Sequence, residues 1–176
     1  MDKYRNYDIA FVGLKNGKHE FQFEIGKAFF ELFDTEQEFT NPRIVAEALL
    51  EKHSTFLELT IRTSGTVNLV CDLTGSPFDY PIDNTLKVLV KYGETYDDTN
   101  EEVITIPHSD HAFNIAQLVY EDVMLSIPMK KISPEVSEED WAILEQYNPS
   151  EPDGQEDEES EGDPRWEALK KLKEKN

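Results

Sequence analysis

Cys71, within residues 70–74, is the only cysteine in the sequence and the most obvious candidate nucleophile. A catalytic cysteine needs a lowered pKa, which usually comes from a neighbouring histidine or cation. The neighbours of Cys71 along the chain are apolar except for Asp72, whose negative charge opposes formation of the thiolate. If the residues alternate, Cys71 shares a face with Val67 and Leu69, and free cysteines are commonly buried. We therefore interpret Cys71 as a buried structural thiol.

The segment His108-Ser109-Asp110-His111 has the composition of a metal site. Zinc normally takes four ligands, with further Cys or His residues at defined spacing. The other two histidines, His19 and His53, fall in expected turns and have no matching partner. A solvated loop after Pro107 explains the segment, because polar residues favour such loops. We expect no metal centre.

The acidic run at residues 97–102 could be mistaken for a calcium loop. It lacks the central glycine and the alternating ligands of an EF-hand, so we interpret it as a solvated acidic loop. The sequence contains no glycine-rich phosphate loop, no Gly-x-Ser-x-Gly elbow and no His-Glu-x-x-His pair. We therefore expect no catalytic residues, no cofactor and no enzymatic activity.

The C-terminal part joins an acidic segment to a small basic one. Residues 151–163 contain eight carboxylates and no Lys or Arg. Such a segment cannot bury enough surface to offset its ordering entropy, which predicts a disordered linker over residues 149–163. Asp163 is a typical N-cap and Pro164 a typical first helical residue, and they predict a basic helix over residues 164–176.

This predicted helix is the candidate site of contact with a partner. Its apolar residues form a narrow stripe that begins at Trp166, and its Lys and Arg side chains could contact phosphates or an acidic surface. The candidate contact residues are Arg165, Trp166, Lys170, Lys171 and Lys173. In the alternative interpretation the helix docks on its own acidic body as a charge-matched cap. Alternation between the two states would make the helix autoinhibitory.

Composition restricts the class of partner and the compartment. The net charge of −20 over 176 residues repels phosphate, so we expect no DNA and no broad nucleic-acid groove on the body. Basic proteins are the more natural partners there. No apolar run reaches the length of a membrane span and no apolar signal-peptide core is present, so we expect no membrane contact. A single cysteine fits a reducing compartment and predicts a cytoplasmic protein.

The N-terminal half is dominated by period-two alternation. Ile9 and Phe11 alternate before Asn16-Gly17, a strong hairpin signal, and a second strand follows through Phe21–Ile25. Residues 27–33 predict one or two buried helical turns. Alternation continues over residues 43–92, with expected turns at Gly65 and at residues 74–77. We interpret residues 46–52 as strand, although their propensity also allows a helix.

The second half adds a strand at Val103–Ile106, which Pro107 ends, and a well-marked helix before Pro128. Asn114 with Gln117 predicts a capping box at its start, and Phe113 with Leu118 a hydrophobic staple. The expected buried stripe is Ile115, Leu118, Val119 and Val123. Ser137 with Asp140, and Val136 with Trp141, predict a second short helix.

These elements predict an α+β fold: an antiparallel, partly barrel-like β-sheet body with a few packed helices. We place the body at residues 1–133, a short helical extension at 134–148, the acidic disordered linker at 149–163 and the basic C-terminal helix at 164–176.

The order of several segments points to a family. An alternating strand ends in Val67-Asn68-Leu69-Val70-Cys71-Asp72, and a second covers residues 86–93. A helix then runs from Asn114 to Leu125-Ser126-Ile127-Pro128, and the tail begins Asp163-Pro164-Arg165-Trp166. The chain thereby resembles the YceD family of bacterial and plastid proteins, which is linked to accumulation of large-subunit (23S) ribosomal RNA.

The resemblance implies a non-enzymatic factor in large-subunit ribosome biogenesis. Its expected partner is the large-subunit precursor, through 23S rRNA, a basic ribosomal protein or both. A second hypothesis makes the chain an acidic escort for a basic ribosomal protein, without direct RNA contact. Many relatives carry a second cysteine where this chain has Thr74, and more cysteines after the position of Pro128. Residues 133–136 offer none here, so a role resting on those cysteines is not expected.

Overall fold

The computed structural model describes residues 3–100 and 103–137. Met1–Pro134 forms one compact unit and Glu135–Asn176 a separate one, and the fold below is that of the first unit. The predicted linker over residues 149–163 and the predicted helix over residues 164–176 lie outside the described residues. So does the predicted extension at 134–148, apart from its first four residues.

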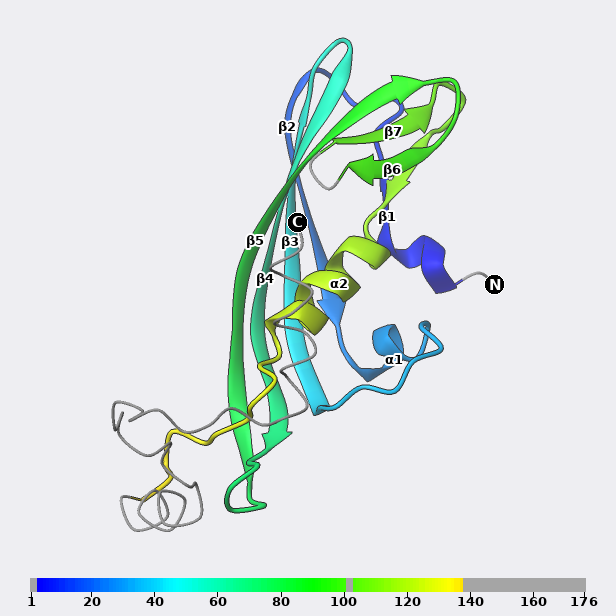
Figure 1. The fold of residues 1–176 in the computed structure, drawn as a ribbon. Coiled ribbons are helices and arrows are strands. Elements are labelled where there is room, and N and C mark those ends of the chain that lie inside the picture. The colour runs from blue at the N-terminus through cyan, green and yellow to red at the C-terminus, as the bar shows by residue number, and fades with distance from the viewer. Residues whose placement is uncertain (1–2, 101–102, 138–176) are drawn as a thin grey trace, which may run out of the picture. The chain divides into compact units, whose positions relative to one another are not determined.

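A sheet of six strands forms the body (Figure 1). Four long strands pair antiparallel in chain order. They are β2 (Gly17–Ile25), β3 (Thr40–Lys52), β4 (Phe56–Val70) and β5 (Pro77–Gly93). The chain then forms β6 (Asp97–Asn100) at the edge and returns as β7 (Val103–Pro107), which lies between β5 and β6.

Two expectations for this sheet are corrected. β7 runs parallel to β5, with Val90 opposite Ile104, so the sheet is mixed rather than wholly antiparallel. Within the described residues the sheet is also open, with β2 and β6 as its two edges, and the expected barrel-like closure is not found. The overall class is α+β with mostly strand, as expected.

The predicted N-terminal hairpin is wrong. β1 (Asp8–Ala10) does not pair with β2; it pairs with β8 (Ala112–Asn114), more than a hundred residues away. This places Ile9 opposite Phe113, and both side chains are buried. β2 pairs with β3 along its whole length. Burial of two apolar strands therefore outweighs the local turn preference of Asn16-Gly17.

The chain between β1 and β2 is held by a lysine instead of by a hairpin ladder. The Nζ atom of Lys52 donates hydrogen bonds to the carbonyl oxygens of Phe11 and Leu14, each at 2.9 Å. The lysine ammonium group has three N–H donors, so one side chain satisfies two loop carbonyls. Both hydrogen bonds come from an ionised donor and are therefore stronger than neutral ones.

The alternation in the long strands is confirmed. Leu57, Leu59 and Ile61 are buried on one face of β4, and Val67, Leu69 and Cys71 continue that face. Residues 46–52 are strand, as interpreted. The turn expected at Gly65 is wrong, because β4 passes through this position, where Gly65 lies between Ile44 of β3 and Ile82 of β5.

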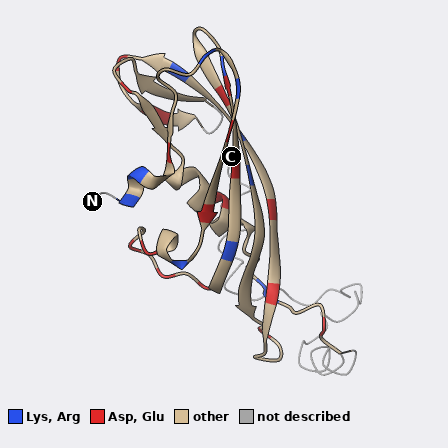
Figure 2. Ribbon diagram, turned by 180° about the vertical axis from the view of Figure 1, so that it is seen from behind, with Lys and Arg blue, Asp and Glu red and all other residues tan. Residues whose placement is uncertain are grey.

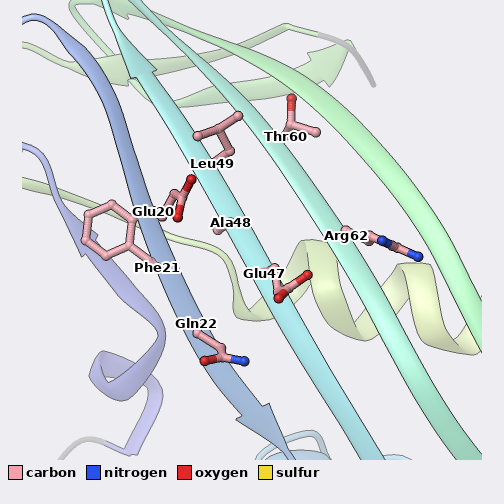
Figure 3. A pocket seen from close by; sticks show the side chains of 8 residues that line it. All are labelled: Glu20, Phe21, Gln22, Glu47, Ala48, Leu49, Thr60 and Arg62. Carbon is pink, nitrogen blue, oxygen red and sulfur yellow. The ribbon is translucent and has the colours of Figure 1, made fainter.

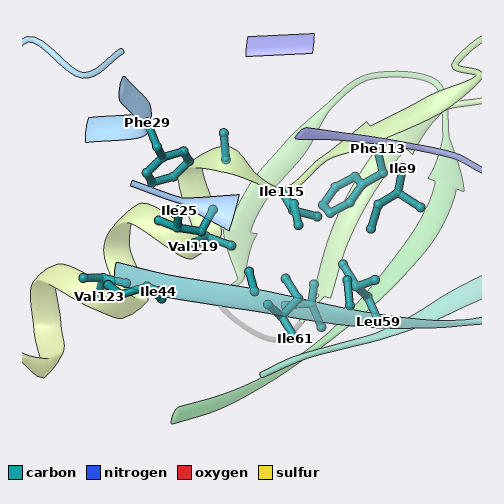
Figure 4. Packing of buried hydrophobic residues seen from close by; sticks show 14 of the residues in the cluster. Ile9, Ile25, Phe29, Ile44, Leu59, Ile61, Phe113, Ile115, Val119 and Val123 are labelled. Carbon is teal, nitrogen blue, oxygen red and sulfur yellow. The ribbon is translucent and has the colours of Figure 1, made fainter. Parts of the chain in front are cut away.

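α2 (Ala116–Ser126) packs on the inner face of the large sheet (Figure 4), and two shorter helices complete the body. These are η1 (Lys3–Tyr7), a 3-10 helix, and α1 (Lys27–Phe30). α2 buries Ile115, Val119 and Val123 as predicted, whereas Leu118 is only partly buried. Phe29 of α1 is buried in the same core, close to Ile25 and Val119 in the view of Figure 4.

The start of α2 differs from the predicted capping box. Asn114 Oδ1 accepts a hydrogen bond from the backbone N–H of Ala116 at 2.9 Å, while its Nδ2 donates to Asp8 Oδ1 at 2.6 Å. The Gln117 side chain reaches forward to Glu121 rather than back to Asn114. Asn114 therefore ties the start of α2 to β1, a contact that needs the distant β1–β8 pairing.

Polar side chains attach α2 to the middle of the sheet. The fully buried hydroxyl of Thr63 on β4 donates a hydrogen bond to Asp122. Asn84 of β5 donates to the hydroxyl of Ser126. Buried polar groups are costly unless they are paired, so α2 must lie where these hydrogen bonds can form. The contacts therefore fix the position of α2 in addition to the burial of its apolar side chains.

Candidate functional site

The outer face of the large sheet is open to solvent and carries residues of both charges (Figure 2). Its middle forms a shallow hollow of about 530 Å³ (Figure 3). The hollow is lined by Glu20, Phe21, Gln22, Glu47, Ala48, Leu49, Thr60 and Arg62. Register places Gln22, Glu47 and Arg62 in one row across β2, β3 and β4.

Arg62 is the one cation among these lining residues, and its charge is already balanced. Its guanidinium donates from Nε to Asp83 Oδ1 at 3.1 Å, and this hydrogen bond with the Asp83 charge raises the pKa of Arg62. Glu20 and Glu47 remain as acceptors in the hollow. Such a surface attracts cationic or hydrogen-bond-donating protein groups and repels phosphate.

A second hollow, of about 640 Å³, gathers histidines that the sequence left unrelated. His53 comes from the β3–β4 turn, and His108 and His111 come from the segment after β7. His108 stacks on Tyr92 with ring centroids 5.8 Å apart. The β3–β4 hairpin thus brings His53 to the same hollow as residues 108–111, although the possible metal partners of His53 are Glu51 and Glu58.

Possible metal ligands lie together at the β3–β4 hairpin and not in the segment at residues 108–111. Within residues 3–100 and 103–137, neither His108 nor His111 belongs to a group of three possible ligands. Such a group consists of Glu51, His53 and Glu58. Sequence reasoning missed it, although a two-residue spacing such as that of Glu51 and His53 puts side chains on one face wherever a chain is extended. The contribution of Glu58 requires knowledge of the β3–β4 register.

The acidic run at residues 97–102 is only partly a loop. Residues 97–100 form β6, an exposed edge strand, and residues 101–102 lie outside the described part of the chain. Asp97 Oδ1 accepts hydrogen bonds from both the backbone N–H and the hydroxyl of Thr99, which lowers the pKa of Asp97.

Cys71 is buried, with 1% of its surface exposed, and its burial was predicted correctly. The lowered pKa of its thiol was not predicted. The backbone N–H of Ser133 donates to Sγ at 3.4 Å, and this bond, with further ones from Thr74 and Leu73, lowers the pKa of Cys71 to about 7. The carboxylate of Asp72, the neighbour expected to oppose the thiolate, accepts the backbone N–H of Lys131 at 2.6 Å and is not among the groups that shift the pKa of Cys71.

This pKa predicts a pH dependence of stability that depends on Cys71. A thiol with an ordinary pKa of 9.0 in the unfolded chain and about 7 in the folded one favours folding when it is deprotonated. The free energy of unfolding, relative to Cys71→Ser, should rise from about pH 7 to about pH 9. The contribution should be lost as the pH falls through 7. Urea unfolding of both proteins across this range measures it, and a difference independent of pH would contradict the assignment.

The predicted contact residues Arg165, Trp166, Lys170, Lys171 and Lys173 lie outside the described residues, so the structure places none of them. In the described part of the chain, no helix combines the length and apolar character needed to cross a membrane.

The described residues define an open, mixed β-sheet with helices packed on one face and a polar, solvent-facing surface on the other. Comparison with known families goes further: the profile of the large ribosomal RNA subunit accumulation protein YceD matches residues 59–173. The chain belongs to the YceD family. No curated protein and no solved structure gives a significant match.

Proposed function

We propose that this protein is a non-enzymatic factor in large-subunit ribosome biogenesis, which promotes accumulation or processing of 23S rRNA through contacts with ribosomal RNA or protein. The observation that carries the proposal is the family match over residues 59–173. That range begins in β4 and continues beyond the compact body into the predicted basic helix.

The chemistry of the body supports binding rather than catalysis. Cys71, the only thiol, is buried against Ser133, and no histidine is hydrogen-bonded to it among the described residues. Nucleophilic catalysis normally needs a base within hydrogen-bond reach of an accessible nucleophile. The outer hollow instead offers carboxylates, an amide and a compensated arginine, which are groups suited to recognition.

We place the contact with the ribosomal precursor on the predicted C-terminal helix. In this proposal Trp166 anchors the helix by burying its ring, and Arg165, Lys170 and Lys171 contact phosphates or an acidic protein surface, with Lys173 beside them. The acidic body cannot easily supply such contacts to RNA, because its charge repels phosphate. The predicted acidic linker would let the helix reach its target independently of the body.

Alanine at Arg165, Lys170 and Lys171 together should weaken co-sedimentation with large-subunit precursors in a sucrose gradient by about tenfold or more. Each phosphate contact contributes to an affinity that falls steeply with salt, so three losses have a large combined effect. The matched control replaces Lys15, Lys87 and Lys91, three exposed lysines of the body, and removes the same charge. Equal sedimentation of the triple variant and the native protein would contradict this placement.

The carboxylates of the outer hollow favour a second candidate, an escort for a basic ribosomal protein. Here the body binds, and the contact involves the hollow with Glu20 and Glu47. Binding to a basic ribosomal protein should then weaken with salt and survive deletion of residues 149–176. Loss of binding on that deletion would favour the first proposal.

A further inference from the structure

The tip of the β3–β4 hairpin carries a cluster of possible metal ligands, which is separate from Cys71 and shares His53 with the second hollow. Glu51 and Glu58 lie directly opposite each other on β3 and β4. His53 follows Glu51 by two residues and lies at the start of the turn between the strands. Its backbone N–H donates a hydrogen bond to the carbonyl oxygen of Phe56 at 3.0 Å, which closes this turn. One ligand atom of each side chain lies within 4.8 Å of the others.

We propose that Glu51, His53 and Glu58 form a binding site for a divalent transition-metal ion, with zinc as the best-fitting ion. The mixed donor set indicates this class, because imidazole suits zinc and its neighbours whereas magnesium and calcium prefer oxygen donors alone. Two ionised carboxylates would neutralise the ion. The net charge of −20 adds a favourable field for cations.

The histidine supplies an observation independent of the carboxylates. The His53 Nε2 atom is shielded from solvent but has no hydrogen-bond partner within the described part of the chain. Glu58 Oε2 lies 3.9 Å away, too far for a hydrogen bond. Buried polar atoms are seldom left unpaired, and a metal ion between Nε2 and the carboxylates would satisfy this one.

The surroundings orient the ligands without preventing closure around an ion. The His53 ring stacks on Phe56, with centroids 4.3 Å apart, which limits its rotation. In a tetrahedral zinc site the ligand atoms lie about 3.3 Å apart, given zinc–ligand bonds of about 2.0 Å. The glutamate side chains are partly or largely exposed and have the freedom to close the remaining distance.

One cation already lies near the cluster. Lys18 Nζ is 3.8 Å from Glu51 Oε2, in a pair whose side chains are 65% and 36% exposed. Exposed pairs of this kind contribute little, so an ion can displace Lys18 or share Glu51 with it. Three protein ligands leave a fourth tetrahedral position for water or for a donor from a binding partner.

Zinc titration of the full-length chain against a chelating indicator tests the site. The native protein should bind one equivalent of zinc more tightly than any other, and His53→Gln, Glu51→Gln and Glu58→Gln should each weaken it at least tenfold. The matched controls are His19→Gln, on β2, and Glu47→Gln, on the outer face of β3, and both should bind as the native chain does. Substitution of cobalt should give the visible absorption of a tetrahedral site in the native protein and the controls.

Two results would overturn the proposal. One is the absence of a tight equivalent in the native chain. The other is zinc binding that His53→Gln and Glu58→Gln leave unchanged. Weak binding by the acidic residues 151–163 would give this second result. Urea unfolding without zinc establishes that the exposed Glu58→Gln variant is folded. The effect of Glu51→Gln separates a metal site from a simple His53–Glu58 ion pair, which does not need Glu51.

Discussion

Gly65→Ala should lower the free energy of unfolding by about 3 kcal/mol or more, a large share of the roughly 5–15 kcal/mol of a typical domain. A Cβ atom at this position would lie 2.1 Å from the Arg43 carbonyl oxygen and 2.7 Å from Ile44 Cα. The Gly65 φ angle of +152° is one that residues with a side chain rarely adopt. β3 and β4 would have to separate where their pairing holds the centre of the sheet.

Gly13→Ala is the matched control for this effect. Gly13 also has a positive φ, of +88°, but nothing lies within 4 Å of a Cβ placed there. It should therefore show only the conformational cost, about 1 kcal/mol. Urea unfolding of both variants separates contact from conformation. Equal midpoints would show that β3 does not approach β4 at Gly65 as closely as described.

Phe29→Ala should destabilise the body by about 3–5 kcal/mol. The Phe29 ring is 1% exposed and is the centre of an aromatic cluster that joins η1 to α1 and the residues directly after α1. Its centroid lies 4.8 Å from that of Tyr7, 5.1 Å from that of Phe30 and 5.4 Å from that of Phe33. Truncation removes these contacts and leaves a cavity between η1, α1 and the sheet.

Two comparisons test the account of Phe29. Phe29→Leu keeps much of the volume and should cost less, about 1–2 kcal/mol. Val12→Ala changes an apolar side chain that is 57% exposed and should alter the free energy of unfolding by less than about 0.5 kcal/mol. A Phe29→Ala midpoint close to that of Val12→Ala would show that the cluster does not bear on the stability of the body.

Much of the sheet could be predicted because burial on one face imposes a period of two. Leu57, Leu59 and Ile61 alternate with polar residues, and a shift of one residue would expose all three. The same pattern correctly placed residues 46–52 in a strand despite their helical propensity. Here the environment of β3, between β2 and β4, outweighs intrinsic preference.

The errors arise where distant residues decide. Asn16-Gly17 is a strong local signal, yet β1 pairs with β8, because that pairing buries Ile9 with Phe113. Gly65 was expected to end a strand. It instead lies within β4, where the close approach of β3 leaves no room for a side chain. The parallel pairing of β5 and β7 has no local signal in the sequence, because the chain first forms β6 and only then returns beside β5.

The candidate sites show the same limit. Burial of Cys71 follows from alternation, but its lowered pKa depends on Ser133, which lies 62 residues along the chain. The Glu51, His53 and Glu58 cluster requires the register of one hairpin. The proposed contact residues, Arg165 to Lys173, rest on sequence signals that the described residues do not test.

The ratio of 23S to 16S rRNA in cells depleted of this protein tests the central proposal most directly. The account predicts that the ratio falls on depletion and that the full-length chain restores it. The chain with alanine at Arg165, Lys170 and Lys171 should fail to restore it, whereas the Lys15, Lys87 and Lys91 control should succeed. An unchanged ratio after depletion would contradict a role in large-subunit rRNA accumulation.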